Sequence, residues 1–421
     1  MLLLSAISVV CWLLLALVPR SARPLATSQP DASSTVFAGG VSGSSCLVMG
    51  AGTGYHWQQL YVFLRSFRLH CPDCQLVLFV DRARLTSEDL QLYRLAHAQL
   101  IDATALVELY PNDSLHGGAT THIASSRWQL YYDYLRALPQ FQQLPDPSLF
   151  PSYSSRPNYN PITADMVAAA QREAYQRSSY KLEGYEARRL VVPQPSTVIS
   201  HVFFTDLRDV YWQGNVFSWL PYRHQFEHDD LAWGEQHRPV EAESEGRAES
   251  ESTYSGLWVF SEEVWSGSNK YNNEWTDCAD SEYKNRHRSK PVLCSGTVLA
   301  SYEAALHYLS AMQHFMLKHA RCTRDVGGFD QGAHQMLIHD ALIPHTAVYV
   351  VPSSRGPVGT VGIPLVRHPD TLHFSVYGDL INDWNETYAV VHQYDRGEAL
   401  AKRVRQQFPF DQVKLAAGRT D

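Results

Sequence analysis

The chain has no long basic run, and its apolar runs are all short. It has 421 residues and a net charge of −8, which argues against a nucleic-acid partner. Its longest apolar run, Leu2 to Val18, is shorter than the ~20 residues that usually cross a bilayer. Hydrophobic residues make up 45% of the chain and charged residues 19%, a composition typical of a protein with a sizeable core.

The short apolar run resembles the core of a signal peptide. No positive charge precedes it, so an uncleaved signal anchor is the alternative. We expect residues 1–26 to be a signal peptide or short signal anchor and residues 27–45 to be a flexible stalk. The sequons at Asn112 and Asn385 agree with a luminal location. Together these features predict entry into the secretory pathway, with membrane contact only through the N-terminal segment.

The cysteines lack a second CxxC motif to accompany Cys71-Pro-Asp-Cys74. This disfavours a zinc site and leaves a redox pair, a local disulfide or free thiols. Without Cys11 in the leader, six cysteines remain, an even set that suggests disulfides in an oxidising compartment. Their spacing does not reveal which cysteines pair.

The order of predicted elements is that of an α/β domain over residues 46–410, followed by a tail at 411–421. It opens with a strand at 46–49, a glycine turn, a helix at 57–69 and a strand at 75–80. We expect later strands near 100–109, 198–204, 257–260, 291–300 (with a break at Gly296), 347–351 and 388–391. We expect later helices near 122–138, 164–189, 302–320 and 334–339. Insertions are expected near 145–190 and 235–253, the second acidic and disordered.

The glycine turn lacks the third glycine of a dinucleotide-binding fingerprint. Gly50 and Gly52 follow a strand, and Asp81 ends the next one, where a ribose-binding acid stands in such proteins. Tyr55, however, occupies the place where close helix packing requires Gly or Ala. A nicotinamide-dependent enzyme is therefore one hypothesis, and the turn can equally let the backbone approach another nucleotide.

Two aspartates follow the apolar run Val198 to Phe204. Asp206 and Asp209 can converge only if the strand ends near Thr205 and the backbone turns, because residues three apart on a strand face opposite sides. Two carboxylates at a strand tip suit Mg²⁺ or Mn²⁺. In the alternative interpretation, Asp206 caps a turn and pairs with Arg208.

Two further groups could complete this site. His392 ends a late apolar strand, and an imidazole ligand shifts the preference from Mg²⁺ towards Mn²⁺; the chain holds 19 histidines, so an ordinary structural role is the alternative. Asp330 precedes a predicted helix, where it can cap the helix or present a carboxylate to a substrate hydroxyl. On local sequence alone, the cap is favoured.

Five motifs then occur in a recognisable order. They are Arg127–Leu135, Phe204–Gln213, Cys294–Thr297, Gly328–His334 and Ala389–Arg396. In this order they resemble the motifs of GT-A-type glycosyltransferases that use nucleotide-diphospho-sugars, similar to Golgi-type transferases of eukaryotes and more distantly to glycogenin-like enzymes. The resemblance implies a mixed, mainly parallel α/β sheet flanked by helices, a nucleotide-sugar donor, a glycan or protein acceptor, and the Golgi lumen or secretion.

The resemblance also implies residue roles. Metal ligands would be Asp206, Asp209 and His392; donor contacts would be Tyr55, Arg127, Asp206, Ser295 and Gly296; and Asp330 and Gln331 would line the sugar and acceptor pocket as catalytic residues. The Asp206–Asp209 spacing is DxxD rather than the family's DxD, which leaves open which aspartate binds the ion. A non-catalytic sugar-binding protein on a decayed transferase fold is the alternative from a different class.

Overall fold

The computed structural model describes residues 44–103, 120–152, 161–176, 198–222 and 256–409. The predicted leader, the acidic insertion and the C-terminal tail lie outside these residues, as does Asn112. The predicted stalk also lies outside them except for its last two residues, which belong to the first strand. Within the described residues, none of the helices combines the length and the apolar character that crossing a membrane requires.

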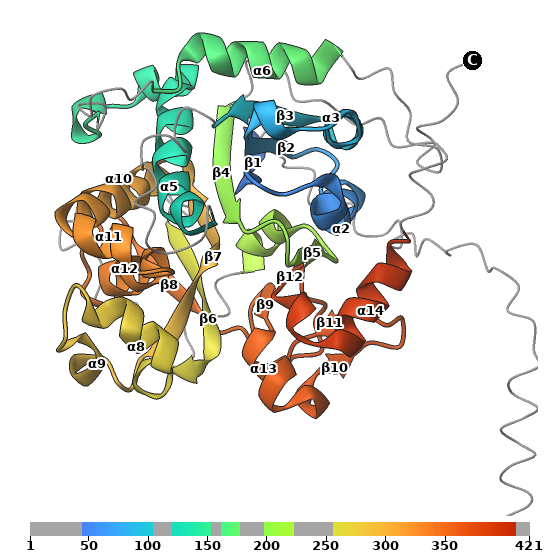
Figure 1. The fold of residues 1–421 in the computed structure, drawn as a ribbon, viewed down its shortest axis with the longest axis vertical. Helices are drawn as coiled ribbons and strands as arrows, with labels where there is room; N and C mark the ends of the chain where they lie inside the picture. Colours follow the sequence, from blue (N-terminus) through green and yellow to red (C-terminus); the bar gives the residue numbers. More distant parts are fainter. Residues whose placement is uncertain (1–43, 104–119, 153–160, 177–197, 223–255, 410–421) are drawn as a thin grey trace, which may run out of the picture. The chain divides into compact units, whose positions relative to one another are not determined.

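The central sheet has seven strands in the order β3-β2-β1-β4-β7-β6-β8 (Figure 1). Strands β1 to β4 are mutually parallel where they pair, β6 is parallel to β8, and β7 is antiparallel to both its neighbours. The bounds are β1 Ser44–Ala51, β2 Gln75–Val80, β3 Ala98–Asp102, β4 Val198–Thr205, β6 Leu257–Trp265, β7 Pro291–Ser301 and β8 Val348–Val351. The mixed, mainly parallel α/β class predicted from the sequence is confirmed.

Helices cover both faces of this sheet, which explains why apolar residues on its central strands point to both faces (Figure 1). The neighbours Phe203 and Phe204 on β4 point to opposite faces and join different core clusters. One cluster takes in α5 Thr120–Ala137, α6 Ala164–Gln176, α10 Tyr302–Lys318 and α12 Phe329–His339; the other takes in α2 Trp57–His70 and α3 Ser87–Leu95. The sheet is therefore buried, and only its edges and strand ends remain for ligands.

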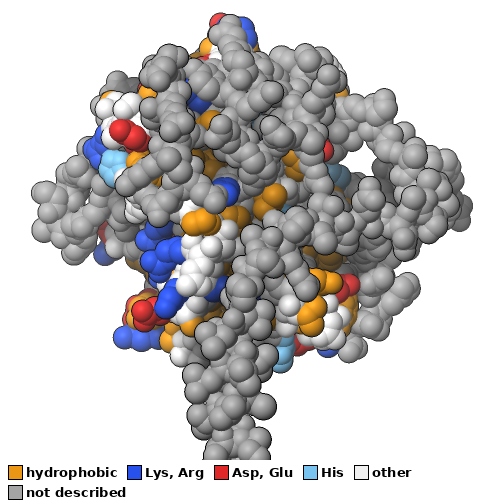
Figure 2. All heavy atoms as spheres, turned by 90° about the vertical axis from the view of Figure 1, so that its right-hand side faces the viewer, with side chains coloured by type: hydrophobic (Ala, Val, Ile, Leu, Met, Phe, Trp, Pro, Cys, Tyr) orange, Lys and Arg blue, Asp and Glu red, His pale blue; other side chains and the backbone are white. Residues whose placement is uncertain are grey.

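Shorter helices complete the fold. They are α8 Lys270–Asp277, α9 Tyr283–Arg286, α11 Ala320–Asp325, α13 Gly362–Arg367 and α14 Glu398–Gln407. On the face shown in Figure 2, a group of Lys and Arg side chains lies beside hydrophobic ones.

A second, three-stranded sheet brings the C-terminal region against the turn after β4. Its order is β5-β12-β9, with β5 Val210–Trp212, β12 Val390–His392 and β9 Val358–Thr360. β12 is antiparallel to β5, and His392 stands opposite Val210. A two-stranded hairpin, β10 His373–Phe374 with β11 Leu380–Ile381, lies nearby in the sequence. The small sheet therefore carries His392 next to Asp209.

Two disulfides join cysteines that are distant in sequence. Cys46 is bonded to Cys74, and Cys278 is bonded to Cys322. Cys71 and Cys294 are free and buried. The pair Cys71 and Cys74 therefore forms neither a local disulfide nor a pair of free thiols, because Cys74 bonds to β1.

Candidate functional site

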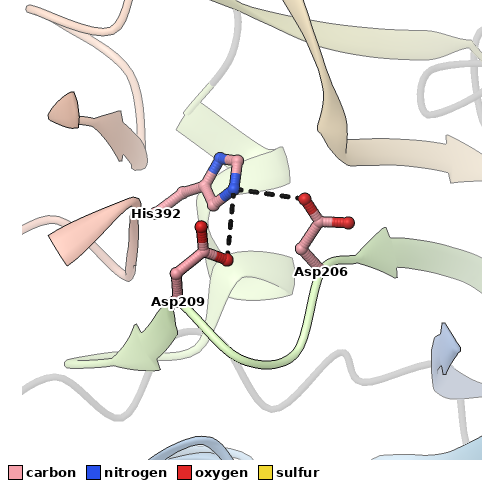
Figure 3. Close-up of side chains that lie close together, drawn as sticks. All are labelled: Asp206, Asp209 and His392. Atoms are coloured by element: carbon pink, nitrogen blue, oxygen red, sulfur yellow. Dashed lines mark ion pairs between the residues drawn. The ribbon is translucent and has the colours of Figure 1, made fainter. Parts of the chain in front are cut away.

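Asp206, Asp209 and His392 lie together at the end of β4 (Figure 3). Nε2 of His392 is 3.3 Å from Oδ2 of Asp206 and 3.7 Å from Oδ1 of Asp209. One ligand atom from each residue lies within 4.8 Å of the others. The three side chains therefore form a group that could hold a metal ion, as the sequence predicted for these positions.

The two carboxylates of the DxxD motif can face the same point because both aspartates lie on a turn rather than on the strand. β4 ends at Thr205, and the backbone N–H of Asp206 donates to the carbonyl of Gly296 at 2.7 Å. The carbonyl of Asp209 accepts from the N–H of Gln393 at 2.7 Å, which ties the far end of the turn to the residue after His392. The predicted turn is thus present, and both ends of it are hydrogen-bonded to the strands that carry the rest of the site.

The Nε2 atom of His392 points toward the two aspartates. The imidazole ring is 2% exposed, and Nε2 lies at ion-pair distance from two carboxylates without a hydrogen bond of good geometry to either. A buried polar atom normally has a partner, and an imidazole nitrogen with two carboxylate oxygens is an ordinary donor set for a divalent ion. The residues present therefore fit a metal.

Gly296 leaves the room that this arrangement requires. A Cβ atom at this position would lie 2.5 Å from Oδ2 of Asp206 and 2.6 Å from Cε1 of His392. The predicted break at Gly296 is wrong, because β7 runs through it without interruption. The glycine is explained by close approach of the two side chains rather than by a bend.

The charges of the triad are strongly perturbed. Burial opposes ionisation of Asp206, but Arg127 and then His392 outweigh it and hold its pKa below the usual value. Burial raises the pKa of Asp209, partly offset by His392. The pKa of His392 is raised well above its ordinary value despite burial, because Cys294 and the two aspartates favour its charged form. A divalent cation would compensate the same pair of carboxylates.

Arg127 on α5 links the triad to α12. Its Nη1 donates to Oδ1 of Asp206, and its Nη2 donates to Oδ2 of Asp330 at 2.8 Å. Nη2 also reaches Oγ of Ser295 at 3.5 Å, and the guanidinium lies over the ring of Trp128. The alternative in which Asp206 pairs with Arg208 is not what the structure shows.

Asp330 is not a helix cap. The N-cap of α12 is Gly328, which has a left-handed backbone with φ of 83°. Asp330 lies inside the first turn, 4% exposed, with its carboxylate held by Arg127. Burial raises its pKa, and Arg127 counteracts this. The cap favoured by the local sequence is wrong because a distant arginine determines where this carboxylate points.

Gln331 is held in a polar network beside the triad. Its Nε2 donates to Oδ1 of Asn272 at 3.0 Å and reaches Oε1 of Glu262 at 3.3 Å. Burial raises the pKa of Glu262, while the charge of His392 lowers it, so Glu262 lies within electrostatic reach of the triad. Sequence reasoning missed Glu262 and Asn272, and no motif marks either residue.

Tyr55 lies near the same strand ends. Burial and then the charge of Asp206 raise the pKa of its phenol, which is half-buried. Of the predicted site residues, the structure places Arg127, Asp206, Asp209, Ser295, Gly296, Asp330 and His392 in one continuous cluster. Tyr55 interacts with this cluster through charge, and Gln331 borders it through Glu262.

The features that suggested a nicotinamide enzyme have other roles. A Cβ at Gly50 would overlap the side chain of Leu207, so this glycine makes room for core packing. Asp81 accepts a hydrogen bond from the backbone of Ala83 at 3.2 Å and pairs with Arg84 at 2.9 Å. These contacts explain both residues without a dinucleotide.

Comparisons with known proteins add little. No protein-family model matches the chain, and no curated protein matches it. Among solved structures it is similar to that of an active-site mutant of LgtC, with 10% identity, a TM-score of 0.35, and coverage of 82% of this chain and 86% of that one. A likeness this distant carries no argument, so the function is inferred from the residues themselves.

Proposed function

We propose that the protein is a metal-dependent glycosyltransferase that moves a sugar from a nucleotide-diphospho-sugar to a hydroxyl of a glycan, glycoprotein or other acceptor. The observation that carries this proposal is the convergence of Asp206, Asp209 and His392 at the end of a parallel strand. Open α/β sheets bind ligands at the carboxyl ends of their strands. The motif resemblance supports the same assignment.

The triad would hold Mn²⁺ or Mg²⁺. Such an ion, when bound, supplies positive charge to the diphosphate that leaves as the sugar bond breaks. The nucleotide side of the site is assigned to Tyr55, whose phenol lies within electrostatic reach of the two aspartates. The backbone of Gly296 lies against Asp206, and the hydroxyl of Ser295 lies 3.5 Å from Nη2 of Arg127, so we assign both residues to donor contact.

Arg127, Asp330 and Gln331 are assigned to the sugar. Arg127 fixes the carboxylates of Asp206 and Asp330 relative to each other through one planar guanidinium. Asp330, whose Oδ2 is held by Arg127, would accept a hydrogen bond from a sugar hydroxyl at Oδ1. Gln331 would line the pocket toward the acceptor. This arrangement orients the donor, since positioning accounts for much of the rate gain in group transfer.

The secretory pathway, with the Golgi lumen as the site of action, is the proposed location. Two disulfides suit an oxidising compartment. Asn385 of the sequon Asn385-Glu-Thr387 is exposed, as glycosylation requires. Any membrane contact would come from the N-terminal segment.

The test is metal-dependent nucleotide binding and turnover. UDP binding is measured by calorimetry with and without Mn²⁺, and hydrolysis of a panel of nucleotide-sugars is measured in parallel. We expect Asp209→Ala to abolish the Mn²⁺-dependent part of UDP binding while the unfolding midpoint is retained, and His392→Ala to weaken the metal more than the nucleotide. Asp370→Ala, which removes an exposed carboxylate, is the matched control.

Each alternative gives a different result. Unchanged UDP affinity in Asp209→Ala would refute the site. Binding of nucleotide-sugars without turnover for any donor would indicate a non-catalytic sugar-binding protein. Equal loss of metal and nucleotide in His392→Ala would assign the histidine a structural role. Binding of NAD(P) in place of UDP would revive the nicotinamide hypothesis.

A further inference from the structure

Two aromatic side chains of α8 form a surface that is open to solvent. Tyr271 is 66% exposed. The centroid of its ring lies 6.4 Å from that of the half-buried Trp275, and the two ring planes differ by 31°. Residues four apart on a helix are neighbours on its surface. The two rings therefore lie side by side, and the one of Tyr271 is free to contact a ligand.

Hydrogen bonds connect this aromatic surface to the proposed sugar site through α12, which lies beside α8 (Figure 1). The Nε2 atom of Gln331 donates to Oδ1 of Asn272, the residue that follows Tyr271, at 3.0 Å. Gln335, one turn further along α12, donates to the same oxygen at 2.6 Å. Because Gln331 is the residue assigned to the acceptor side, α8 borders that side of the proposed site.

Three further contacts hold α8 in place. A Cβ atom at Gly328 would lie 2.6 Å from Cε2 of Trp275, and one at Gly332 would lie 2.9 Å from the carbonyl oxygen of Trp275. The glycines of α12 thus let α8 pack directly against its backbone. Cys278, the C-cap residue of α8, is bonded to Cys322. A helix of eight residues is not stable by itself, so these contacts determine where its aromatic rings lie.

We propose that the rings of Tyr271 and Trp275 bind a sugar unit of the acceptor, and that the acceptor is therefore an oligosaccharide. A pyranose ring presents C–H groups on its faces and hydroxyls around its edge. An aromatic ring can cover the C–H groups, and charged side chains can bond the hydroxyls. Lys270 and Glu274 stand one residue before and three residues after Tyr271, and both are exposed. The inference rests on the proposed function.

A packing role or a protein partner explains this surface less well. Packing accounts for Trp275, which lies against Gly328, but not for Tyr271, whose ring is mostly in solvent. A stable protein interface buries about 800 Å² on each partner, whereas Tyr271 and Trp275 are the only aromatic or aliphatic side chains of α8. An aromatic surface of this size with charged neighbours fits a sugar unit.

The first experiment measures binding to an array of hexose, N-acetylhexosamine and pentose oligosaccharides, so it does not depend on turnover. The full chain is compared with Tyr271→Ala and Tyr271→Phe, and unfolding midpoints are measured on the same samples. We expect Tyr271→Ala to weaken oligosaccharide binding about 10-fold, as for the loss of one aromatic contact, and Tyr271→Phe to bind like the wild type. Tyr377→Ala is the matched control, because Tyr377 is a 90% exposed tyrosine between β10 and β11.

The second experiment measures transfer to the oligosaccharide that binds best, with the nucleotide-sugar that is hydrolysed fastest. We expect Tyr271→Ala to raise the KM for the oligosaccharide by about 10-fold and to change kcat little, because a contact that is equally strong before and during the reaction affects KM alone. A fall in kcat without a change in KM would contradict a binding role for Tyr271.

The outcomes separate this inference from the proposed function. Wild-type protein that hydrolyses a nucleotide-sugar but binds no oligosaccharide would refute the inference alone. Wild-type protein that binds an oligosaccharide through Tyr271 but hydrolyses no donor would refute the proposed function and confirm the sugar-binding surface. Equal affinity in Tyr271→Ala and the wild type, or equal loss in Tyr271→Ala and Tyr271→Phe, would overturn the role of the ring. Loss of Mn²⁺-dependent UDP binding in Tyr271→Ala would show damage to the whole site and would also overturn it.

Discussion

Replacing Gly296 with alanine adds one methyl group beside two of the three proposed metal ligands. The new Cβ would lie 2.5 Å from Oδ2 of Asp206, whereas real Cβ contacts almost never fall below 3.0 Å. The carboxylate must therefore retreat by about 0.5 Å, which is the tolerance within which a working site has to be held. The ring of His392, with Cε1 at 2.6 Å, has to move as well.

The size of the effect follows from these displacements. Overpacking of this kind costs about 1–3 kcal/mol of stability, less than the total of about 5–15 kcal/mol for an ordinary domain. The Gly296→Ala protein should therefore fold. Its Mn²⁺ affinity should fall by about 10- to 100-fold, the usual cost of changing a residue that orients metal ligands.

The assay is Mn²⁺ titration at a temperature well below the unfolding midpoint, with the midpoint measured on the same samples. Gly214→Ala is the control, because its Cβ would approach the backbone of Ala389 on the β12 side no closer than 3.4 Å. We expect Gly214→Ala to bind Mn²⁺ like the wild type. Wild-type affinity in Gly296→Ala would show that the ion is bound elsewhere and would refute the geometric argument.

Two further predictions concern α5. Arg127→Ala leaves Asp330 buried without its partner and should lower the free energy of unfolding by about 3–5 kcal/mol in urea denaturation; a loss below about 1 kcal/mol would contradict the role of this arginine. Burial raises the pKa of Asp133 on α5 to about 7, and its carboxylate accepts one hydrogen bond from Gln129 at 2.9 Å. Because this pKa is higher in the folded state than in the unfolded state, the stability contributed by protonated Asp133 is present below about pH 4 and is lost as the pH rises to about 7. Asp133→Asn should remove this loss, which reaches about 4 kcal/mol for three pKa units; parallel stability profiles for variant and wild type from pH 4 to 8 would refute the assignment.

The sequence predicted those parts of the site whose position follows from strand ends. An apolar run followed by two acids predicted that β4 ends near Thr205, just before Asp206, and a second apolar run predicted the position of His392. Both predictions held because hydrophobic burial decides where a strand lies, and its end follows. The mixed α/β fold class was predictable for the same reason.

The rest of the site depends on contacts between distant segments. Glu262 and Asn272 gain their roles only because α12 places Gln331 between them. Local propensity favoured a cap at Asp330, and the ion pair with Arg127 overrides it. The same holds for Gly50, whose fingerprint-like position reflects packing against Leu207. No local pattern can reveal these contacts, because each joins residues tens to hundreds of positions apart.

The pairing of β5 with β12 has a consequence for how the site responds to change. His392 stands opposite Val210, directly after Asp209, so a shift of one residue in this register would turn the imidazole to the other face. An ion that binds both Asp209 and His392 would therefore stabilise the pairing of β5 with β12. It would also protect the backbone amides of this small sheet from hydrogen exchange. By reciprocity, any partner that loosens or tightens this C-terminal sheet changes the affinity for the ion by the same factor.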